Sequence, residues 1–449
     1  MEPNTNFSST NPPAVAFVTM GCAKNEVDTQ RMQSQLRRAG FAIANDPQTA
    51  NAVVVNTCSF IQSATEESLE AIFEVAGMPN VAAGAALIVA GCMPARYGEE
   101  LADELQEASA FVPCSKEDDI SSIVAGALGL TDGVLEDLRS ATLGAVPEGA
   151  IALDGTRAVS AYVKISDGCD RFCSYCTIPY IRGRYHSFPY EQVRQDVADR
   201  VAEGVREVVL IAQDPGRWGQ DFDEPSSLGT LAGKLADEFP DTWFRIMYIQ
   251  PEGITDELLA TVAGHDNICN YFDIPLQHVQ PHILKAMHRK GSREEYEQLM
   301  EHVRDMEPGV TLRTTLIAGF PGETEDDFDE LCDFVEEGLF DYIGVFAYSR
   351  EEGTRAYDLP DQVEEDEKAF RAQRLRDLAD DVCTPLIASR VGSTVDVLVE
   401  GAEEDGQLFG RAMCQAPEVD GVTYVDHGKP GEIVRVKIAD TLLYEMEGE

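Results

Sequence analysis

Basic residues are scarce in this sequence. Its 449 residues include 35 Lys and Arg against 80 Asp and Glu, which gives a formal net charge of −45. Because proteins bind nucleic acid largely by neutralising phosphates with Lys and Arg, we expect no direct nucleic-acid binding. Such acidity favours encounter with a basic partner instead. An acidic proteome in the source organism would give the same composition, so the charge alone leaves both explanations open.

Long apolar runs are missing as well. The longest, at residues 85–93, has the length of a strand and is too short to cross a bilayer. Residues 1–15 contain neither the basic nor the apolar segment of a secretory signal and read as a short disordered tail. We therefore expect a cytoplasmic protein without membrane contact. In that reducing compartment, 11 cysteines indicate metal ligands more than disulfides.

Two series of alternating patterns occupy most of the chain. Residues 14–130 repeat an apolar run, a turn and a stretch of helical periodicity, which predicts a parallel sheet with crossover helices. Residues 131–154 lack clear periodicity and are expected to form a linker. Residues 155 to about 360, in a domain expected at 155–385, contain six further apolar runs separated by helical stretches. They predict a complete or partial β/α barrel, followed by a charged helix at 363–389.

The last part of the chain, residues 386–449, changes character. Short runs of β-branched residues lie between Gly, Asp and Pro turns, which is typical of a small all-β barrel. This part carries 13 acidic and 5 basic residues, so it is acidic in its own right. The predicted fold class is α/β, with an N-terminal parallel α/β domain, a partial β/α barrel and a small C-terminal all-β barrel.

Three cysteines lie close together in the stretch CDRFCSYC, at Cys169, Cys173 and Cys176. A structural zinc site and a [4Fe–4S] cluster each usually have four ligands. Three thiolates would leave one iron of a cluster open for a substrate group, as an open position does in catalytic zinc sites. The loop follows the first predicted barrel strand, so we expect it at the mouth where barrel active sites lie. A zinc loop or a group of structural thiols is the alternative.

Three other cysteines are far apart in sequence but share a position relative to the predicted strands. Cys22, Cys58 and Cys92 each end, or lie just beyond, an apolar run. Because the carboxyl ends of parallel strands meet at one edge of a sheet, we expect the three thiols to converge there. A second three-cysteine cluster is the functional interpretation. Three buried structural cysteines are the alternative.

The stretch CDRFCSYC resembles the signature of the radical S-adenosylmethionine (SAM) superfamily, with Tyr175 before the last cysteine. In that superfamily the open iron binds the amino and carboxylate groups of SAM, and the reduced cluster cleaves the coenzyme to a deoxyadenosyl radical. From residue 14 onward the chain resembles the methylthiotransferase family, whose last domain is called TRAM; MGCAKNEVDTQ, NTCSF, DIPLQH and GFPGET match its patterns. The resemblance implies SAM as co-substrate and two [4Fe–4S] clusters, on Cys22, Cys58 and Cys92 and on Cys169, Cys173 and Cys176.

Several stretches, among them IAQD, YIQPEGIT and GRAMCQAPEVDGVTYV, are similar to the RimO branch of that family. That branch modifies an aspartate of the small-subunit ribosomal protein S-twelve. The resemblance implies abstraction of a hydrogen from the aspartate β-carbon and installation of a methylthio group there. The acidic last domain agrees, since a TRAM barrel that grips RNA should be basic. The alternatives are the branch that modifies an adenosine beside the tRNA anticodon and a non-catalytic iron–sulfur electron carrier.

Other residues carry weaker signals. Tyr175, Gln213 and Gly319 are candidate coenzyme contacts, although Gln213 also suits an ordinary barrel mouth and Gly319 an ordinary turn into a helix capped by Thr324. Arg182 and Arg184 could bind an anion or be surface charges, and Asp273 could be catalytic or simply hydrogen-bonded. The sequence identifies no catalytic residue, electron donor or sulfur source. The cysteines that fit no ligand pattern are expected to be buried thiols; they are Cys114, Cys269, Cys332, Cys383 and Cys414.

Overall fold

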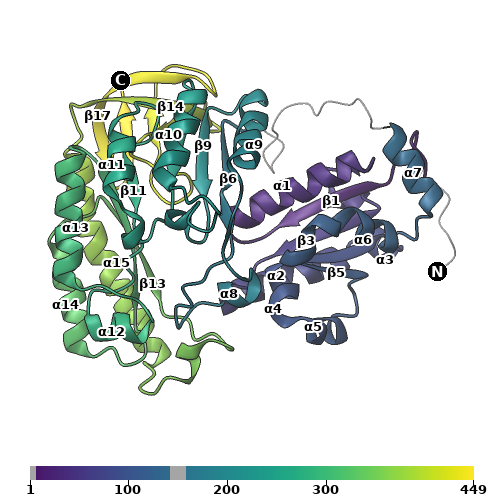
Figure 1. Cartoon of the computed structure of the whole chain (residues 1–449), viewed down its shortest axis with the longest axis horizontal. Helices are drawn as coiled ribbons and strands as arrows, with labels where there is room; N and C mark the ends of the chain where they lie inside the picture. Colours follow the sequence, from purple (N-terminus) through teal and green to yellow (C-terminus); the bar gives the residue numbers. More distant parts are fainter. Residues whose placement is uncertain (1–6, 142–157) are drawn as a thin grey trace. The chain divides into compact units, whose positions relative to one another are not determined.

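The structure is a computed structural model and describes residues 7–141 and 158–449 (Figure 1). By internal contacts the chain divides into two compact units. The N-terminal unit comprises Met1–Glu148, Gly168–Asp170 and Cys176–Arg184, and the C-terminal unit comprises the other residues up to Glu449. Two pieces of the cysteine loop and the segment after it therefore belong, by their contacts, to the N-terminal unit.

The N-terminal unit is built on one parallel sheet with the strand order β2-β1-β3-β4-β5. Helices α1 and α6 cover one face around Met32 and Val124, and α2 and α4 cover the other around Ile72 and Met93. Because both faces are covered, every residue of β3 and β4 is buried. The elements are β1 Ala14–Thr19, α1 Ala23–Arg38, β2 Ala42–Ile43, β3 Ala52–Thr57, α2 Gln62–Ala76, α3 Pro79–Ala82, β4 Ala86–Gly91, α4 Cys92–Tyr97, α5 Glu99–Glu104, β5 Ala110–Pro113, the 3-10 helix η2 Cys114–Asp119, α6 Ile120–Ala127 and α8 Ile178–Ile181.

Part of the predicted linker is a helix, α7, at Asp132–Ala141. Leu135 and Leu138 lie three residues apart, so they share one helix face; Leu138 is buried, and Leu135 packs against the core that contains α1 and α6. The linker prediction was therefore wrong for this stretch, because its ten residues are fewer than the about 11–18 over which helical periodicity is read. The rest of the predicted linker up to residue 154 lies outside the described residues.

The C-terminal unit contains the predicted partial barrel. Its six strands form two parallel sheets, β10-β9-β6 and β11-β12-β13, which a parallel bridge between Phe244 and Ile268 connects. The helices that follow the strands pack their apolar faces onto one continuous core. The elements are β6 Ser160–Lys164, β7 Ser166–Asp167, β8 His186–Ser187, α9 Tyr190–Ala202, β9 Glu207–Ile211, α10 Leu228–Glu238, β10 Trp243–Ile246, α11 Asp256–Ala263, β11 Tyr271–Asp273, α12 Pro281–Ala286, α13 Arg293–Met306, β12 Thr311–Ala318, α14 Glu325–Glu336 and β13 Tyr342–Ala347.

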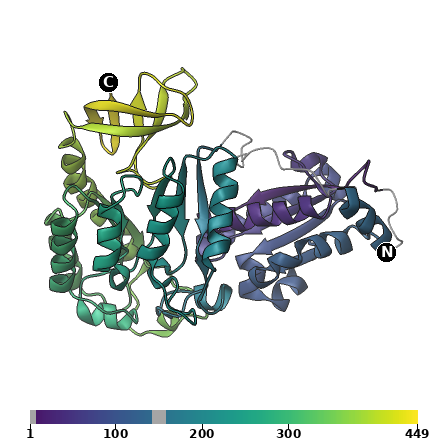
Figure 2. The same cartoon turned by 45° about the horizontal axis from the view of Figure 1, so that its top comes forward.

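A small closed barrel ends the chain, as predicted (Figure 2, yellow). The charged helix α15, Glu365–Ala388, leads into it and packs against β12 and β13 on the way. The barrel strands have the order β14-β15-β16-β18-β17. They are β14 Thr394–Ala402, β15 Leu408–Ala412, β16 Thr423–Val425, β17 Ile433–Leu442 and β18 Glu445–Gly448. The predicted fold class is confirmed.

Buried charges join the small barrel to the amino ends of the partial-barrel strands. The carboxylate of Glu207, the first residue of β9, lies 2.5 Å from Arg411 of β15 and 2.9 Å from Arg245 of β10. Arg245 also donates to the carbonyl of Met413 at 2.8 Å. Burial alone would raise the pKa of Glu207, but Arg411 and then Arg245 bring it down to about 2. The ionised carboxylate is therefore the stable form at this junction.

A second buried carboxylate at the same junction, Asp420, has a raised pKa instead of a lowered one. Asp420 accepts hydrogen bonds from Tyr271 Oη and from the Ala416 N–H, both at 2.8 Å, and lies 3.6 Å from Arg313. Burial raises the pKa of Asp420 to about 6, and these partners offset only part of that effect. A carboxyl whose pKa is raised on folding contributes stability below its unfolded pKa, and this contribution is lost as the pH rises through the folded value.

We therefore expect Asp420→Asn to flatten the pH dependence of the unfolding free energy between about pH 4 and pH 6.5, because the amide does not ionise. The parent protein should lose stability over that range relative to the variant. Guanidinium unfolding followed by the fluorescence of Trp218 and Trp243, both in the C-terminal unit, measures this. Asp396→Asn, at a partly exposed carboxylate paired with Arg435, is the control. Identical slopes for parent and Asp420→Asn would refute the assignment.

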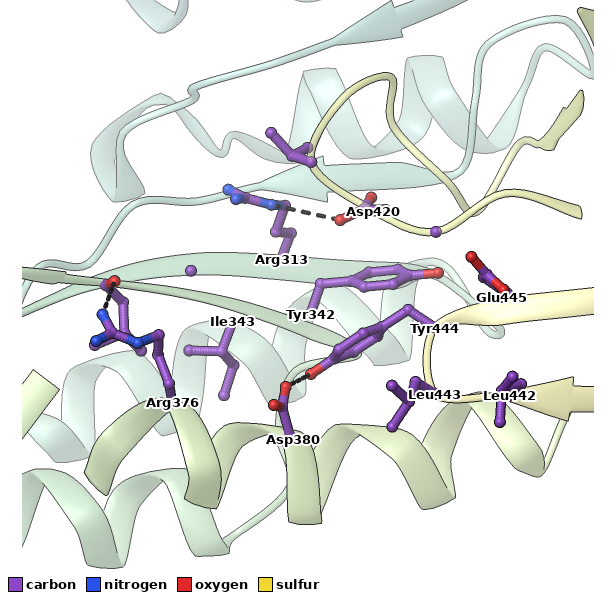
Figure 3. A pocket seen from close by; sticks show the side chains of 14 residues that line it. Arg313, Tyr342, Ile343, Arg376, Asp380, Asp420, Leu442, Leu443, Tyr444 and Glu445 are labelled. Atoms are coloured by element: carbon purple, nitrogen blue, oxygen red, sulfur yellow. Dashed lines mark hydrogen bonds and ion pairs between the residues drawn. The ribbon is translucent and has the colours of Figure 1, made fainter. Parts of the chain in front are cut away.

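A pocket of 520 Å³ lies beside this junction (Figure 3). Arg313 and Tyr342, early in β12 and β13, line one side, and the turn between β17 and β18 lines the other. The Tyr444 ring packs against Tyr342 with centroids 5.8 Å apart, and its hydroxyl donates to Asp380 of α15 at 2.7 Å. The amino ends of barrel strands lie away from the catalytic mouth, and no cysteine lines this pocket. It is therefore not the candidate coenzyme site.

Candidate functional site

The first predicted set of cysteines lies at one edge of the N-terminal sheet. Cys58 and Cys92 directly follow the paired last residues of β3 and β4. Cys22 comes shortly after β1, at the start of α1. Gly21 has a φ of +90°, and a Cβ there would lie 2.5 Å from the Cβ of Cys58, so glycine lets the two segments approach each other. The expected convergence at the carboxyl edge is present for these segments.

The thiols of this edge interact with one another. Cys58 and Cys92 are buried, whereas Cys22 is exposed. Hydrogen bonding to Cys114 and to Cys58 lowers the pKa of the Cys92 thiol, and the charge of Arg182 lowers it further, against the effect of burial. The pKa of Cys58 is raised, first by its hydrogen bond to Cys92 and then by burial. Among Cys58, Cys92 and Cys114, Cys92 is thus the one that most readily becomes a thiolate, which is the metal-binding form.

Arg182 belongs to the same edge of the N-terminal unit. Its side chain is 2% exposed and lies 2.5 Å from the buried carboxylate of Asp28 and 2.8 Å from Asn25 Oδ1. Its Nη2 lies 3.9 Å from the Cys92 Sγ. The alternative that Arg182 is a surface charge was therefore wrong, because a buried carboxylate on α1 holds it. Arg184 is 76% exposed and contacts Asp170 at 3.2 Å, as a surface charge would.

The cysteine loop of the second set is anchored by Arg171. This residue contacts the buried carboxylate of Asp214 through two hydrogen bonds, at 2.7 and 3.1 Å, and contacts Glu252 at 3.0 Å. Also within the C-terminal unit, Arg289 Nη1 lies 4.0 Å from the Cys173 Sγ. A guanidinium at that place offers a thiolate a charge-assisted partner. The sequence-based predictions missed Asp214 and Arg289, although IAQD contains Asp214 at the end of a barrel strand.

Backbone strain gathers in the segments around this loop. Of the seven non-glycine residues that adopt left-handed conformations in the described part of the chain, four lie here: Phe172 at φ 49°, Tyr248 at 70°, Gln277 at 75° and His288 at 59°. Phe172 lies in the loop itself, Tyr248 and Gln277 follow β10 and β11, and His288 Nδ1 lies 3.1 Å from the Phe172 carbonyl. Strained residues of this kind persist where the surrounding structure holds them and are common at ligand sites. Two of the four follow barrel strands, which agrees with the expectation that the site lies at the carboxyl ends of these strands.

Unpaired acceptors occur at the same strand ends. The buried Oε1 atoms of Gln213, after β9, and Gln250, after β10, have no hydrogen-bond partner in the structure. A buried polar atom without a partner is costly, so such atoms commonly await a ligand or water. This agrees with the prediction that Gln213 contacts the coenzyme, and it adds Gln250, which the sequence gave no reason to select.

A pocket of 390 Å³ opens beside Cys173. Besides Cys173 and Arg171, its lining includes the cationic Lys285, Arg289 and Lys290, the imidazole of His288 and the carboxylate of Glu252. In a chain with a net charge of −45, so many cationic groups at one place favour an anionic ligand group, such as a carboxylate. This pocket, and not the larger one near the small barrel, is next to the chemistry that the cysteine loop predicts.

The remaining candidates have structural partners. Gly319 has a φ of +78°, and its N–H donates to the buried carboxylate of Glu323, which also contacts Arg371 at 2.8 Å. Thr324 caps α14 with a capping box, as predicted. Asp273 is buried and accepts hydrogen bonds from Arg313 and from the Tyr248 N–H, which supports the simply hydrogen-bonded alternative. The coenzyme contacts of Gly319 and Tyr175 stay predictions.

Of the five cysteines outside the two sets, four are buried and one is only partly buried. Burial raises the pKa of Cys269 and Cys383 to about 12 and of Cys332 to about 11, and Cys414 is also buried, so these four are buried thiols as expected. Cys114 is only partly buried and interacts with Cys92, so its expected burial was wrong. Its place directly after β5 was the missed signal.

Within residues 7–141 and 158–449, no three His, Cys, Asp or Glu side chains are arranged to hold a metal ion. An iron–sulfur cluster makes a different demand, since each thiolate binds a separate iron and the cluster itself spaces the ligands. The donor chemistry at the sheet edge, where buried thiols lie beside a guanidinium, fits such a group. No helix of the described residues is long and apolar enough to cross a membrane.

Comparison with known families matches three stretches of the chain. Residues 14–113 match the uncharacterized protein family UPF0004, residues 163–335 match the radical SAM superfamily, and residues 391–449 match the TRAM domain. Membership of the radical SAM superfamily implies a [4Fe–4S] cluster and SAM.

Two solved structures show the same fold. The radical SAM methyltransferase TsrM from Kitasatospora setae has a TM-score of 0.57 at 14% identity and covers 77% of this chain and 74% of its own. The cobalamin-dependent SAM radical enzyme OxsB has a TM-score of 0.51 at 13% identity and covers 83% of this chain and 56% of its own. At these identities the likeness concerns the fold alone.

Curated relatives are much more similar in sequence. Proteins named ribosomal protein uS12 methylthiotransferase RimO from Trichlorobacter lovleyi and Geobacter sulfurreducens are each 40% identical to this chain, over 97% of it and 97–98% of their own length. The protein of the same name from Clostridioides difficile is 38% identical over 97% and 98%. The chain therefore belongs to the RimO family of radical SAM methylthiotransferases.

Proposed function

We propose that this protein installs a methylthio group on the β-carbon of an aspartate in the small-subunit ribosomal protein uS12. The observation that carries the proposal is the full-length similarity to relatives of that name, in a chain that retains both sets of three cysteines. Family membership supports this activity over the tRNA-modifying and electron-carrying alternatives.

Cys169, Cys173 and Cys176 are the proposed ligands of the cluster that works with SAM, and Cys22, Cys58 and Cys92 are the proposed ligands of a second [4Fe–4S] cluster. Cys169, Cys173 and Cys176 would hold this cluster, which when bound and reduced would supply the electron for the cleavage of SAM. The protein's own groups orient and bind. Arg171 and Asp214 fix the loop, Arg289 provides a cation beside Cys173, and Gln213 and Gln250 offer unpaired acceptors to donor groups of the coenzyme.

The charge of the chain suits the proposed substrate. Ribosomal proteins that contact RNA are basic, and a protein with a net charge of −45 attracts a basic partner over long range. The small barrel contributes to this negative charge, with 13 acidic and 5 basic residues. We therefore expect binding to uS12 to weaken as ionic strength rises.

A product assay tests the proposal. The anaerobically reconstituted and reduced protein receives SAM, a sulfide source, and either unmodified small ribosomal subunits or unmodified tRNA. We expect mass spectrometry to find one added methylthio group on an aspartate-containing peptide of uS12 and an unchanged tRNA. A modified nucleoside with an unchanged uS12 peptide would show that the tRNA branch is correct.

A further inference from the structure

The carboxyl edge of the N-terminal sheet carries one more cysteine than the proposed cluster uses. Thr57 of β3 pairs with Gly91 of β4, and Gly91 pairs with Pro113 of β5, so the three strands end in one row. Each of these residues is followed directly by a cysteine, which places Cys58, Cys92 and Cys114 side by side. Cys58 and Cys114 therefore each follow a strand that is a direct neighbour of the strand before Cys92.

Contacts around Cys114 agree with the register. Its thiol interacts with that of Cys92, and the 3-10 helix η2 that it begins packs against α4, which begins at Cys92. Cys114 is neither exposed to solvent like Cys22 nor enclosed in an apolar core like Cys269. Arg182 Nη2 lies 3.9 Å from the Cys92 Sγ, so a cation lies beside the thiol that Cys114 contacts. This is the setting of a ligand group and not of a packing thiol.

We infer that Cys114 is a fourth, exchangeable thiolate ligand of the N-terminal cluster, which occupies the iron left open by Cys22, Cys58 and Cys92 until the sulfur to be transferred replaces it. The inference rests on the proposed function, because it presumes that cluster. In the exchange, the iron–sulfur bond to Cys114 breaks as a bond to the incoming sulfur forms. No electron moves, and a proton released by an incoming thiol can pass to the departing Cys114 thiolate.

The test uses the full-length chain in which Cys169, Cys173 and Cys176 are replaced by Ala, so that only the N-terminal cluster remains. This background is compared with the same chain carrying Cys114→Ala, and with one carrying Cys332→Ala as a control for the loss of a thiol elsewhere. Each should contain about four irons per chain after anaerobic reconstitution. The probe is ¹³C-labelled methanethiolate, whose hyperfine coupling in the electron paramagnetic resonance spectrum of the reduced cluster reports binding.

A thiolate that occupies the iron nine-tenths of the time weakens the apparent affinity of a competitor about tenfold. We therefore expect Cys114→Ala to bind methanethiolate about tenfold more tightly than the background and the Cys332→Ala control. Equal affinities in chains that hold four irons would overturn the role of Cys114 and leave the proposed function untouched. A background that assembles no cluster would overturn both.

A second measurement needs no substitution at Cys114. In the same background, iodoacetamide should alkylate Cys114 in the cluster-free protein, spare it in the cluster-loaded protein, and label it again when methanethiolate saturates the iron. Peptide mass spectrometry quantifies each state. Equal labelling with and without the cluster would exclude Cys114 as a ligand even if the Cys114→Ala chain failed to fold.

Discussion

Cys173→Ala should abolish reductive cleavage of SAM while leaving about four irons per chain on the N-terminal unit. The proposed loop cluster needs all three of its thiolates, and Cys173 is the one that lies beside Arg289 and lines the cationic pocket. The N-terminal edge supplies its own thiols at Cys58 and Cys92, so its iron should be retained. Chromatography of 5′-deoxyadenosine after dithionite reduction, together with iron analysis, measures both effects.

The control for this result is Cys332→Ala, which removes a buried thiol from α14 that has no role in either proposed set. It should retain SAM cleavage and about eight irons per chain. Cleavage at the parent rate by Cys173→Ala would refute the assignment of the loop. Loss of all iron in that variant would instead contradict the independence of the two clusters.

Arg411→Met should destabilise the C-terminal unit by about 3 kcal/mol, since it removes one partner of a buried ion pair and leaves Glu207 with incomplete compensation. Arg411 is 4% exposed and holds Glu207 at 2.5 Å and Glu400 at 2.6 Å. Its removal should also raise the pKa of Glu207 from about 2, because Arg411 is the strongest of the groups that lower it. The shift in the guanidinium midpoint of tryptophan fluorescence reports the loss.

The small barrel provides a matched control for this prediction. Arg435 forms a two-point ion pair with Asp396 at 2.7 and 2.8 Å, but its side chain is 73% exposed. Because water screens such a pair, Arg435→Met should leave the guanidinium midpoint nearly unchanged. Equal losses in the two variants would mean that the buried junction does not stabilise the contact between the partial barrel and the small barrel.

Periodicity and strand-end positions predicted most of what the structure contains. The six barrel strands and the closed terminal barrel follow from alternating apolar runs, which depend only on local sequence. The placement of Cys58 and Cys92 at one edge follows from the parallel sheet alone. Helix α7 was missed because its ten residues are fewer than the about 11–18 over which helical periodicity is read.

Contacts between residues that are far apart in the sequence could not be predicted. The sequence left open whether Arg182 binds an anion or is a surface charge, because its neighbouring residues do not indicate the buried ion pair with Asp28, 154 residues earlier. Arg289 lies 116 residues beyond Cys173, and Cys114 seemed unrelated to any ligand spacing until the register of β4 and β5 placed it beside Cys92. Such pairings are set by how strands align, and a single sequence records this only indirectly.

The central claim is that the two sets of cysteines hold separate clusters. Iron analysis and Mössbauer spectroscopy of the full-length chain, of the chain with Cys22, Cys58 and Cys92 replaced by Ala, and of the chain with Cys169, Cys173 and Cys176 replaced by Ala test it most directly. We predict about eight, four and four irons per chain, all in [4Fe–4S] form. Four irons in the parent protein, or none in either triple variant, would contradict the account.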